Sequence, residues 1–197
     1  MDADESVSEY TLVSASADKT YAALGDAEVS GDRLLGTLGG LTDLAERLGG
    51  ETVRSRKLGE LLGPELGFVS LADEHGARRA VGVVVRYSAF DRAVERVDPK
   101  EFSAFAVPGH VKVVLAFALE AQGGDRTVLG CDIRIRATDD DTRSALRSIW
   151  FLAAPALRLG ARRLLELIRR EAESGPQGAE GGDRDRDHGD AAHLSSG

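Results

Sequence analysis

The stretch from Asp139 to Glu173 constrains the fold of this chain most strongly, because it has the pattern of one long amphipathic helix. At ~100° per residue one face is apolar, bulky at both ends and small in the middle. That face comprises Leu146, Ile149, Ala153, Ala156, Leu157, Gly160, Leu164 and Leu167. The opposite face carries Arg147, Arg158, Arg162, Glu166 and Arg169. A helix that is small at its centre leaves room when it lies across a curved sheet, so the pattern predicts a protein that encloses something.

Two segments directly before this helix, 110–121 and 126–137, alternate in polarity. Their apolar residues fall at odd positions: Val111, Val113, Leu115, Phe117, Leu119, Leu129, Cys131, Ile133 and Ile135. Alternation indicates strands with one buried face, and the two strands should form an antiparallel hairpin. Paired residues lie on the same side of the sheet, so their numbers must add up to an even value. A loop of three or five residues around Gly123 and Gly124 satisfies this condition, and a loop of two or four does not.

The remaining elements are predicted from turn residues and local periodicity. They are a strand at 7–14, a short helix capped by Ser16 or Asp18, one or two helices within 31–48, a turn at Leu58, Leu61 and Leu62, a hairpin of 68–73 with 79–88, and a strand at 102–107. Pro155 cannot bond to the carbonyl of Phe151, so the long helix should bend there. The fold class is therefore α+β, with a curved antiparallel sheet wrapped around a long C-terminal helix.

Charge and cysteine content limit the class of protein. The net charge of −8 argues against a nucleic-acid binder or a general binder of anionic membranes. Cys131 is the only cysteine, which excludes an intrachain disulfide and fits a reducing cytoplasm. The first residues contain no apolar signal segment, and the longest apolar run, 149–157, is shorter than the ~20 residues of a membrane span. We expect a cytoplasmic protein with no membrane span.

The two ends of the chain differ in composition. Residues 174–197 are rich in glycine, aspartate and serine and are expected to form a disordered acidic tail after a folded domain at 1–173. The glycine-rich segment from Gly25 to Gly67 is expected to be a mobile lid, because glycine raises backbone entropy and weakens helices.

Two motifs give the chain a family resemblance. The segment 102–112, FSAFAVPGHVK, and the segment 132–139, DIRIRATD, followed by a helix with Arg143, Trp150 and Pro155, resemble bacterial proteins of the START-like, or SRPBCC, superfamily. The resemblance covers about residues 7–173. It implies the helix-grip fold of the polyketide cyclase/dehydrase and lipid-transport members. It also implies a hydrophobic molecule held between the sheet and the last helix.

The expected ligand-binding residues line that space. They are Tyr87, Val113, Leu115, Phe117, Cys131, Ile133, Trp150, Ala153, Ala156 and Leu157. Tyr87, Thr127 and Cys131 add polar or semi-polar groups on the predicted inner side, where a hydroxyl can orient a ligand. The competing interpretation is that each is an ordinary core group. No catalytic residue is assigned, because the inner positions listed for the last hairpin contain no Asp, Glu, His or Lys.

Charged clusters elsewhere have simpler explanations. Lys112, Arg134 and Arg136 share the outer side of adjacent strands and could bind an anion, but a solvated face is favoured. The histidines and Cys131 lack metal-site spacing, so no metal and no cofactor are expected. Asp139, Asp140 and Asp141 are expected to cap the long helix rather than bind a metal.

Three functional hypotheses follow. The first is a module that binds a small hydrophobic or amphipathic ligand, such as a lipid or a polyketide-like molecule. The second is a polyketide cyclase or aromatase-like enzyme, in which hydroxyl groups polarise carbonyls. The third is an interaction protein whose cavity has collapsed. A filled interior favours the third hypothesis, and ordered polar groups in a hydrated cavity favour the second.

Overall fold

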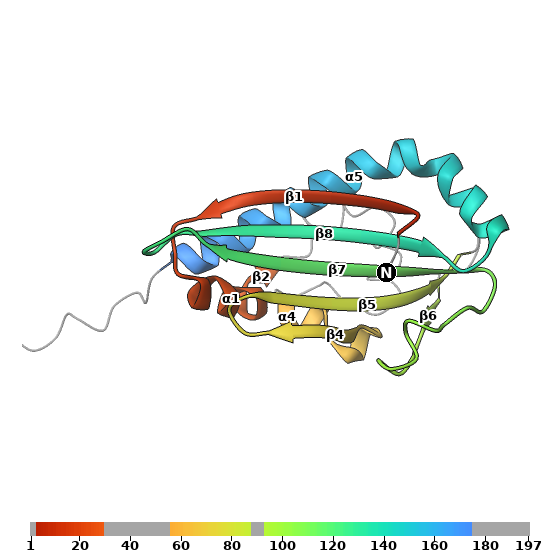
Figure 1. Cartoon of the computed structure of the whole chain (residues 1–197), viewed down its shortest axis with the longest axis horizontal. Coiled ribbons are helices and arrows are strands. Elements are labelled where there is room, and N and C mark those ends of the chain that lie inside the picture. The colour runs from red at the N-terminus through yellow and green to blue at the C-terminus, as the bar shows by residue number, and fades with distance from the viewer. Residues whose placement is uncertain (1–2, 30–55, 88–92, 175–197) are drawn as a thin grey trace, which may run out of the picture.

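The computed structural model describes residues 3–29, 56–87 and 93–174. A six-stranded antiparallel sheet forms the framework of this part of the chain, with strand order β1-β8-β7-β5-β4 and β6 paired to β5 (Figure 1). The strands are β1 (Glu5–Val13), β4 (Val69–Glu74), β5 (Arg78–Arg86), β6 (Val94–Glu95), β7 (His110–Ala121) and β8 (Thr127–Ala137). The predicted first strand, the 68–88 hairpin and the last hairpin are confirmed.

The β7–β8 hairpin has the register that alternation requires. Val113 pairs with Ile135 and Leu115 with Ile133, so the apolar odd positions share one face. The pairing ends at Ala121 and Thr127, which leaves a five-residue loop, one of the two lengths predicted. Gly123 and Gly124 in this loop have φ values of +80° and +59°, a backbone region in which glycine meets no side-chain clash.

Helix α5 (Asp140–Glu173) crosses the concave face of the sheet and curves along its length (Figure 1). Asp139 is its N-cap, because its side chain accepts a hydrogen bond from the Thr142 N–H. Pro155 lies within the helix, where it removes one backbone hydrogen bond and permits the curvature. The predicted helix-grip architecture is confirmed.

Shorter helices extend the same layer. Helix α1 (Ala17–Asp26) begins after the predicted cap Ser16. It is followed by β2 (Glu28–Val29), β3 (Arg56–Lys57), α4 (Leu58–Leu61) and the 3-10 turn η1 (Pro64–Leu66). Leu24, Leu58 and Leu165 join the inner-face residues of β7 and β8 in one buried core. The helices predicted within 31–48, most of the Gly25–Gly67 segment and nearly all of the tail lie outside the described residues.

The strand predicted at 102–107 is wrong. Residues 98–105 form successive turns, in which the N–H groups of Phe102 and Phe105 bond to the carbonyls of Asp98 and Glu101. Phe102 is 4% exposed and packs with Val84 and Val114 on the outer face of the sheet. Its apolar side chain therefore covers the sheet instead of extending it. The short strand β6 precedes these turns in the sequence and pairs with the end of β5.

Charged residues of α5 pair both within the helix and with the sheet. Arg170 and Arg169 both donate to Glu166, with 2.8 Å between Arg170 Nε and Glu166 Oε1. Arg162 reaches Glu9 on β1, with 2.8 Å between Nε and Oε2. The long arginine side chain thus ties the helix to the sheet, which periodicity within one helix cannot predict.

In the described part of the chain, no helix is both long enough and apolar enough to cross a membrane.

Candidate functional site

The concave face of the sheet is built from cross-strand rows of apolar side chains. Val83, Val113 and Ile135 form one row across β5, β7 and β8, and Val81, Leu115 and Ile133 form the next. Phe117 and Cys131 continue the pattern as the third row, in which the β5 member is Arg79. The structure thus brings together the strand residues of the predicted ligand site on the face that α5 crosses.

The cover over these rows is incomplete. Phe117 and Ile133 are 2% and 6% exposed, yet Val113 and Leu115, on the same concave face of the central strand β7, are only half-buried. The facing part of α5 has the same character, because Trp150, Ala153, Ala156 and Leu157 are half-buried. Later turns of the helix bury Gly160, Ala161, Leu164, Leu165 and Ile168. Apolar groups on both sides of the interior are thus left partly uncovered around the first half of α5.

Two of the three polar candidates are ordinary core groups by their contacts. Thr127 is fully buried, and its hydroxyl donates to the Ala15 carbonyl at 2.8 Å. Burial raises the pKa of the Cys131 thiol to about 12, and the nearby charges of Asp132 and Glu9 act in the same direction. A thiol in such surroundings is unreactive. Tyr87 differs, since it is half-buried and packs at the edge of the core, with its backbone N–H bonded to the Gly109 carbonyl.

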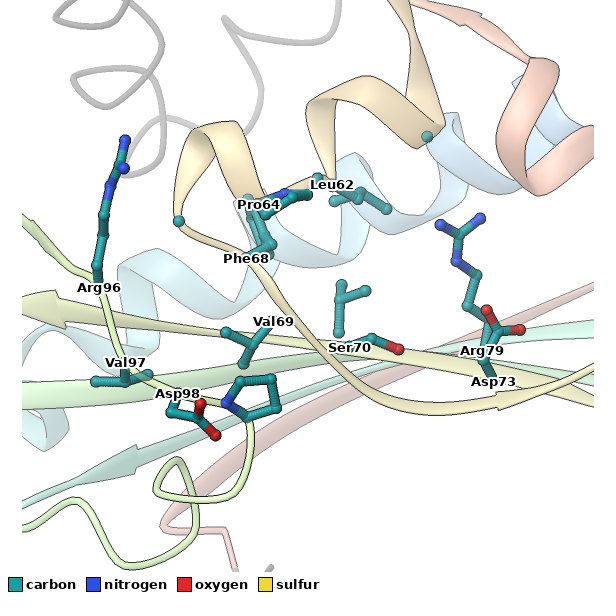
Figure 2. Close-up of a pocket in the computed structure, with 15 residues that line it drawn as sticks. Leu62, Pro64, Phe68, Val69, Ser70, Asp73, Arg79, Arg96, Val97 and Asp98 are labelled. Atoms are coloured by element: carbon teal, nitrogen blue, oxygen red, sulfur yellow. The ribbon is translucent and has the colours of Figure 1, made fainter.

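A pocket of about 530 Å³ opens beside β4 and β5, beneath α4 and η1 (Figure 2). Its apolar lining includes Leu62, Phe68 and Val81. Val81 belongs to the second concave row, next to Leu115, so the pocket adjoins the predicted ligand site. None of these three residues was assigned to the ligand site from sequence.

One end of this pocket holds Asp73 and Arg79, which occupy opposite positions of the neighbouring strands β4 and β5 (Figure 2). The Tyr21 hydroxyl of α1 donates to the Asp73 carboxylate. The sequence indicates that Arg79 faces the concave side, because it occupies the odd position before Val81 and Val83. Asp73 is not signalled, because a register shift between Ser70 and Ala72 moves it from the outer to the inner side of β4.

The outer face of the sheet holds the basic residues Lys112, Arg134 and Arg136. Lys112 is buried and donates from Nζ to the carbonyls of Ser103 and Phe105, at 3.0 and 2.9 Å. Burial lowers its pKa, and the charge of Arg136 lowers it further. Arg134 pairs with Asp132, with 2.6 Å between Nε and Oδ2. Arg134 and Arg136 are exposed, as the interpretation of a solvated face predicts. Lys112 departs from that prediction, because it is buried beneath the turns of 98–105 and bonds to their carbonyls.

Asp139 joins the start of α5 to the sheet. Its carboxylate accepts hydrogen bonds from the Thr142 and Gly109 N–H groups, at 2.9 and 2.6 Å, and from the Thr142 hydroxyl. These bonds hold the pKa of Asp139 well below its usual range. The predicted capping role is thus confirmed. Within residues 3–29, 56–87 and 93–174, no group of three His, Cys, Asp or Glu side chains is placed to hold a metal.

No protein-family model and no curated protein matches the chain. Solved structures similar to it include the Zhui aromatase/cyclase from a Streptomyces species, at 18% identity, with 90% of this chain and 98% of that chain covered and a TM-score of 0.32. Truncated norcoclaurine synthase from Thalictrum flavum matches at 10% identity over 87% and 94% of the chains, with a TM-score of 0.40. The di-domain ARO/CYC protein BexL matches at 11% identity over 87% of this chain and 51% of that chain, with a TM-score of 0.37.

These superpositions are too loose to carry an argument about activity. The fold rests on the chain's own features: antiparallel strands in the order β1-β8-β7-β5-β4 and a 34-residue terminal helix across their concave face. This arrangement is the helix-grip fold that the sequence resemblance implied.

Proposed function

We propose that this protein binds a small hydrophobic or amphipathic molecule between the concave face of its sheet and the first half of α5. The observation that carries the proposal is the incomplete burial of Val113 and Leu115 on the central strand. In a filled core, the central strand is the most completely covered. Here part of the apolar surface stays exposed, and a ligand can cover it. Each Å² of apolar surface that the ligand removes from water contributes about 25 cal/mol to the free energy of binding.

The facing helix supports the same proposal. Ala153 and Ala156 have small side chains, and neither residue is itself fully buried. The pocket at the β4 edge is lined in part by Val81, the cross-strand neighbour of Leu115. The third hypothesis, a collapsed and filled cavity, fits these observations less well.

Native mass spectrometry of freshly purified protein tests the proposal directly. We expect the intact protein to carry an additional mass that organic extraction removes. Ala153→Trp should abolish the additional mass, because an indole would occupy the uncovered space. The matched control is Ser148→Trp, at an exposed position of the same helix, which should retain the ligand. Absence of any extractable molecule, together with failure to bind a panel of apolar dyes, would contradict the proposal.

The alternative function is a cyclase or aromatase-like enzyme. One observation favours it: the Tyr21 hydroxyl donates a hydrogen bond to Asp73, which lines the pocket. A hydroxyl and a carboxylate in contact are the groups from which a general acid–base pair is built. Tyr21→Phe separates the two functions. Under the binding hypothesis, neither the wild-type protein nor the variant turns over a polyketide-like substrate. Under the enzyme hypothesis, the wild-type protein does so, and the variant is slower by ~100-fold or more.

A further inference from the structure

Arg79 is unusual among the arginines of the sheet because it faces the concave side. Its cross-strand neighbour on β7 is Phe117, which is 2% exposed, and the side chain of Arg79 is half-buried in the pocket lining. Among the residues that the structure describes, no side-chain hydrogen bond or ion pair engages its guanidinium. The residue as a whole is half-buried, but none of its nitrogens is fully enclosed. A guanidinium in this position can bind an anion without first breaking an ion pair.

The neighbouring acid does not satisfy Arg79. Asp73 lies directly across from it on β4, but its carboxylate accepts from the Tyr21 hydroxyl. Figure 2 shows the Arg79 side chain extended from the strand toward the helical layer, with the Asp73 carboxylate beside its stem. The donors of the guanidinium therefore face the pocket and are available to a ligand.

We infer that the ligand carries an anionic head group, a carboxylate or a phosphate monoester, that binds to Arg79, while its apolar part extends over the concave rows. This inference rests on the proposed function and specifies the ligand class. A guanidinium matches both oxyanions through two parallel hydrogen bonds. The next concave row begins at Val81, which continues to half-buried Leu115, so an apolar chain anchored at Arg79 has uncovered apolar surface ahead of it.

Two other arginines provide contrasts. Arg96 also lines the pocket, at the end away from Arg79, and it is exposed to solvent, where an ion pair contributes little (Figure 2). Arg78 is adjacent in sequence but points to the opposite face, where its Nε lies 3.0 Å from Glu74 Oε1. Arg78→Gln is thus the matched control for Arg79→Gln, and Arg96→Gln tests the rival anchor.

The first experiment needs no variant. Isothermal titration calorimetry at neutral pH would compare dodecanoic acid, dodecyl phosphate and dodecanol, which share one apolar chain. We expect at least one anion to bind about tenfold or more tightly than the alcohol, the difference typical of a hydrogen bond to a charged group. The anion with the larger gain identifies the head group. Equal affinity for all three overturns the inference and leaves the proposed function intact, whereas no binding of any of them contradicts both.

The second experiment locates the anchor. Arg79→Gln should remove the preference for the anion while leaving dodecanol binding unchanged, and Arg79→Lys should restore part of it. Arg78→Gln and Arg96→Gln should keep the preference. Loss of the preference in Arg96→Gln but not in Arg79→Gln would overturn the assignment. Because the binding of dodecanol reports on an intact apolar site, a variant that has merely unfolded is recognised by its failure to bind the alcohol.

Discussion

The two halves of α5 have the same helical periodicity but different surroundings. In the C-terminal half, which we call the packed half (160–173), Leu165 and Ile168 are 1% and 0% exposed. In the N-terminal half, which we call the loose half (140–157), Trp150 and Leu157 are only half-buried, and Ile149, on the predicted apolar face, is 40% exposed. An apolar stripe therefore marks a helix face without saying how completely that face is covered.

Residue size does not explain the difference. The packed half contains the small residues Gly160 and Ala161, and both are buried. The loose half contains the equally small Ala153 and Ala156, and neither is fully buried. Small side chains thus lie in a close contact in one half of the helix and in an incompletely covered region in the other.

The largest difference between the halves should appear on truncation of leucine. Leu165→Ala should lower the free energy of unfolding by about 2–5 kcal/mol, because it leaves a cavity in a packed core. Leu157→Ala should cost less than about half as much, since its side chain already lies beside uncovered space. Urea unfolding of both variants measures the contrast. Equal losses would mean that the two halves are packed alike.

Enlarging a side chain tests the same contrast in the opposite direction. Ala161→Trp should destabilise the protein by about 1–3 kcal/mol or more, because overpacking a filled site displaces its neighbours. Ala153→Trp should change the free energy of unfolding by a smaller amount, because its indole enters open space. Thermal unfolding with the ligand extracted gives the comparison. A large loss for Ala153→Trp would show that no space exists beneath the loose half.

Low pH should destabilise the N-terminal end of α5. Because hydrogen bonds hold the pKa of Asp139 below its usual range, the folded state favours the ionised carboxylate. The corresponding stability is present above pH ~4 and is lost as the pH falls further toward the folded-state pKa. Asp139→Ala removes this contribution at every pH. The difference in Tm between wild type and Asp139→Ala should therefore shrink between pH ~5 and ~2, and a constant difference would contradict the assignment.

Tyr87 should give the smallest effect. It follows β5, near Gly109 and therefore near the start of α5, and it is the polar group that the sequence predicts to orient a ligand. Tyr87→Phe should weaken ligand binding by about 0.5–1.5 kcal/mol, the usual range for one neutral hydrogen bond, with no change in Tm. Calorimetry with the extracted ligand measures this change. A loss of turnover of ~100-fold or more with unchanged binding would instead support the enzyme hypothesis.

The parts of the fold that depend on periodicity were predictable from sequence. Alternation fixed the facing sides of β7 and β8 and limited their loop length, because one slip would turn every apolar side chain to solvent. The cap at Asp139 and the bend at Pro155 follow from local chemistry.

Features that depend on contacts distant in sequence were not predictable. The bulge in β4 that turns Asp73 inward has no marker in the alternating pattern. The residues that follow Phe102 in sequence have a strand-like pattern, yet the segment forms turns and Phe102 packs on the outer face of the sheet. The uncovered apolar surface beneath the loose half was inferred from residue size alone, and the pocket that carries Arg79 required the helical layer above β4.

The hydrogen bonds at the two ends of α5 determine how the helix can move. At its start, Asp139 accepts from the Gly109 N–H, and at its end Glu173 accepts from the Ser14 N–H at 2.8 Å. The helix is thus tied to the rest of the molecule at both ends, so neither end can move away while these hydrogen bonds remain formed. Between these two ends, Pro155 removes one backbone hydrogen bond of the helix, and such a position is where a helix bends most readily. Under the proposed function, a ligand would therefore enter beneath α5 by bending of the helix near its middle, while both terminal hydrogen bonds stay formed.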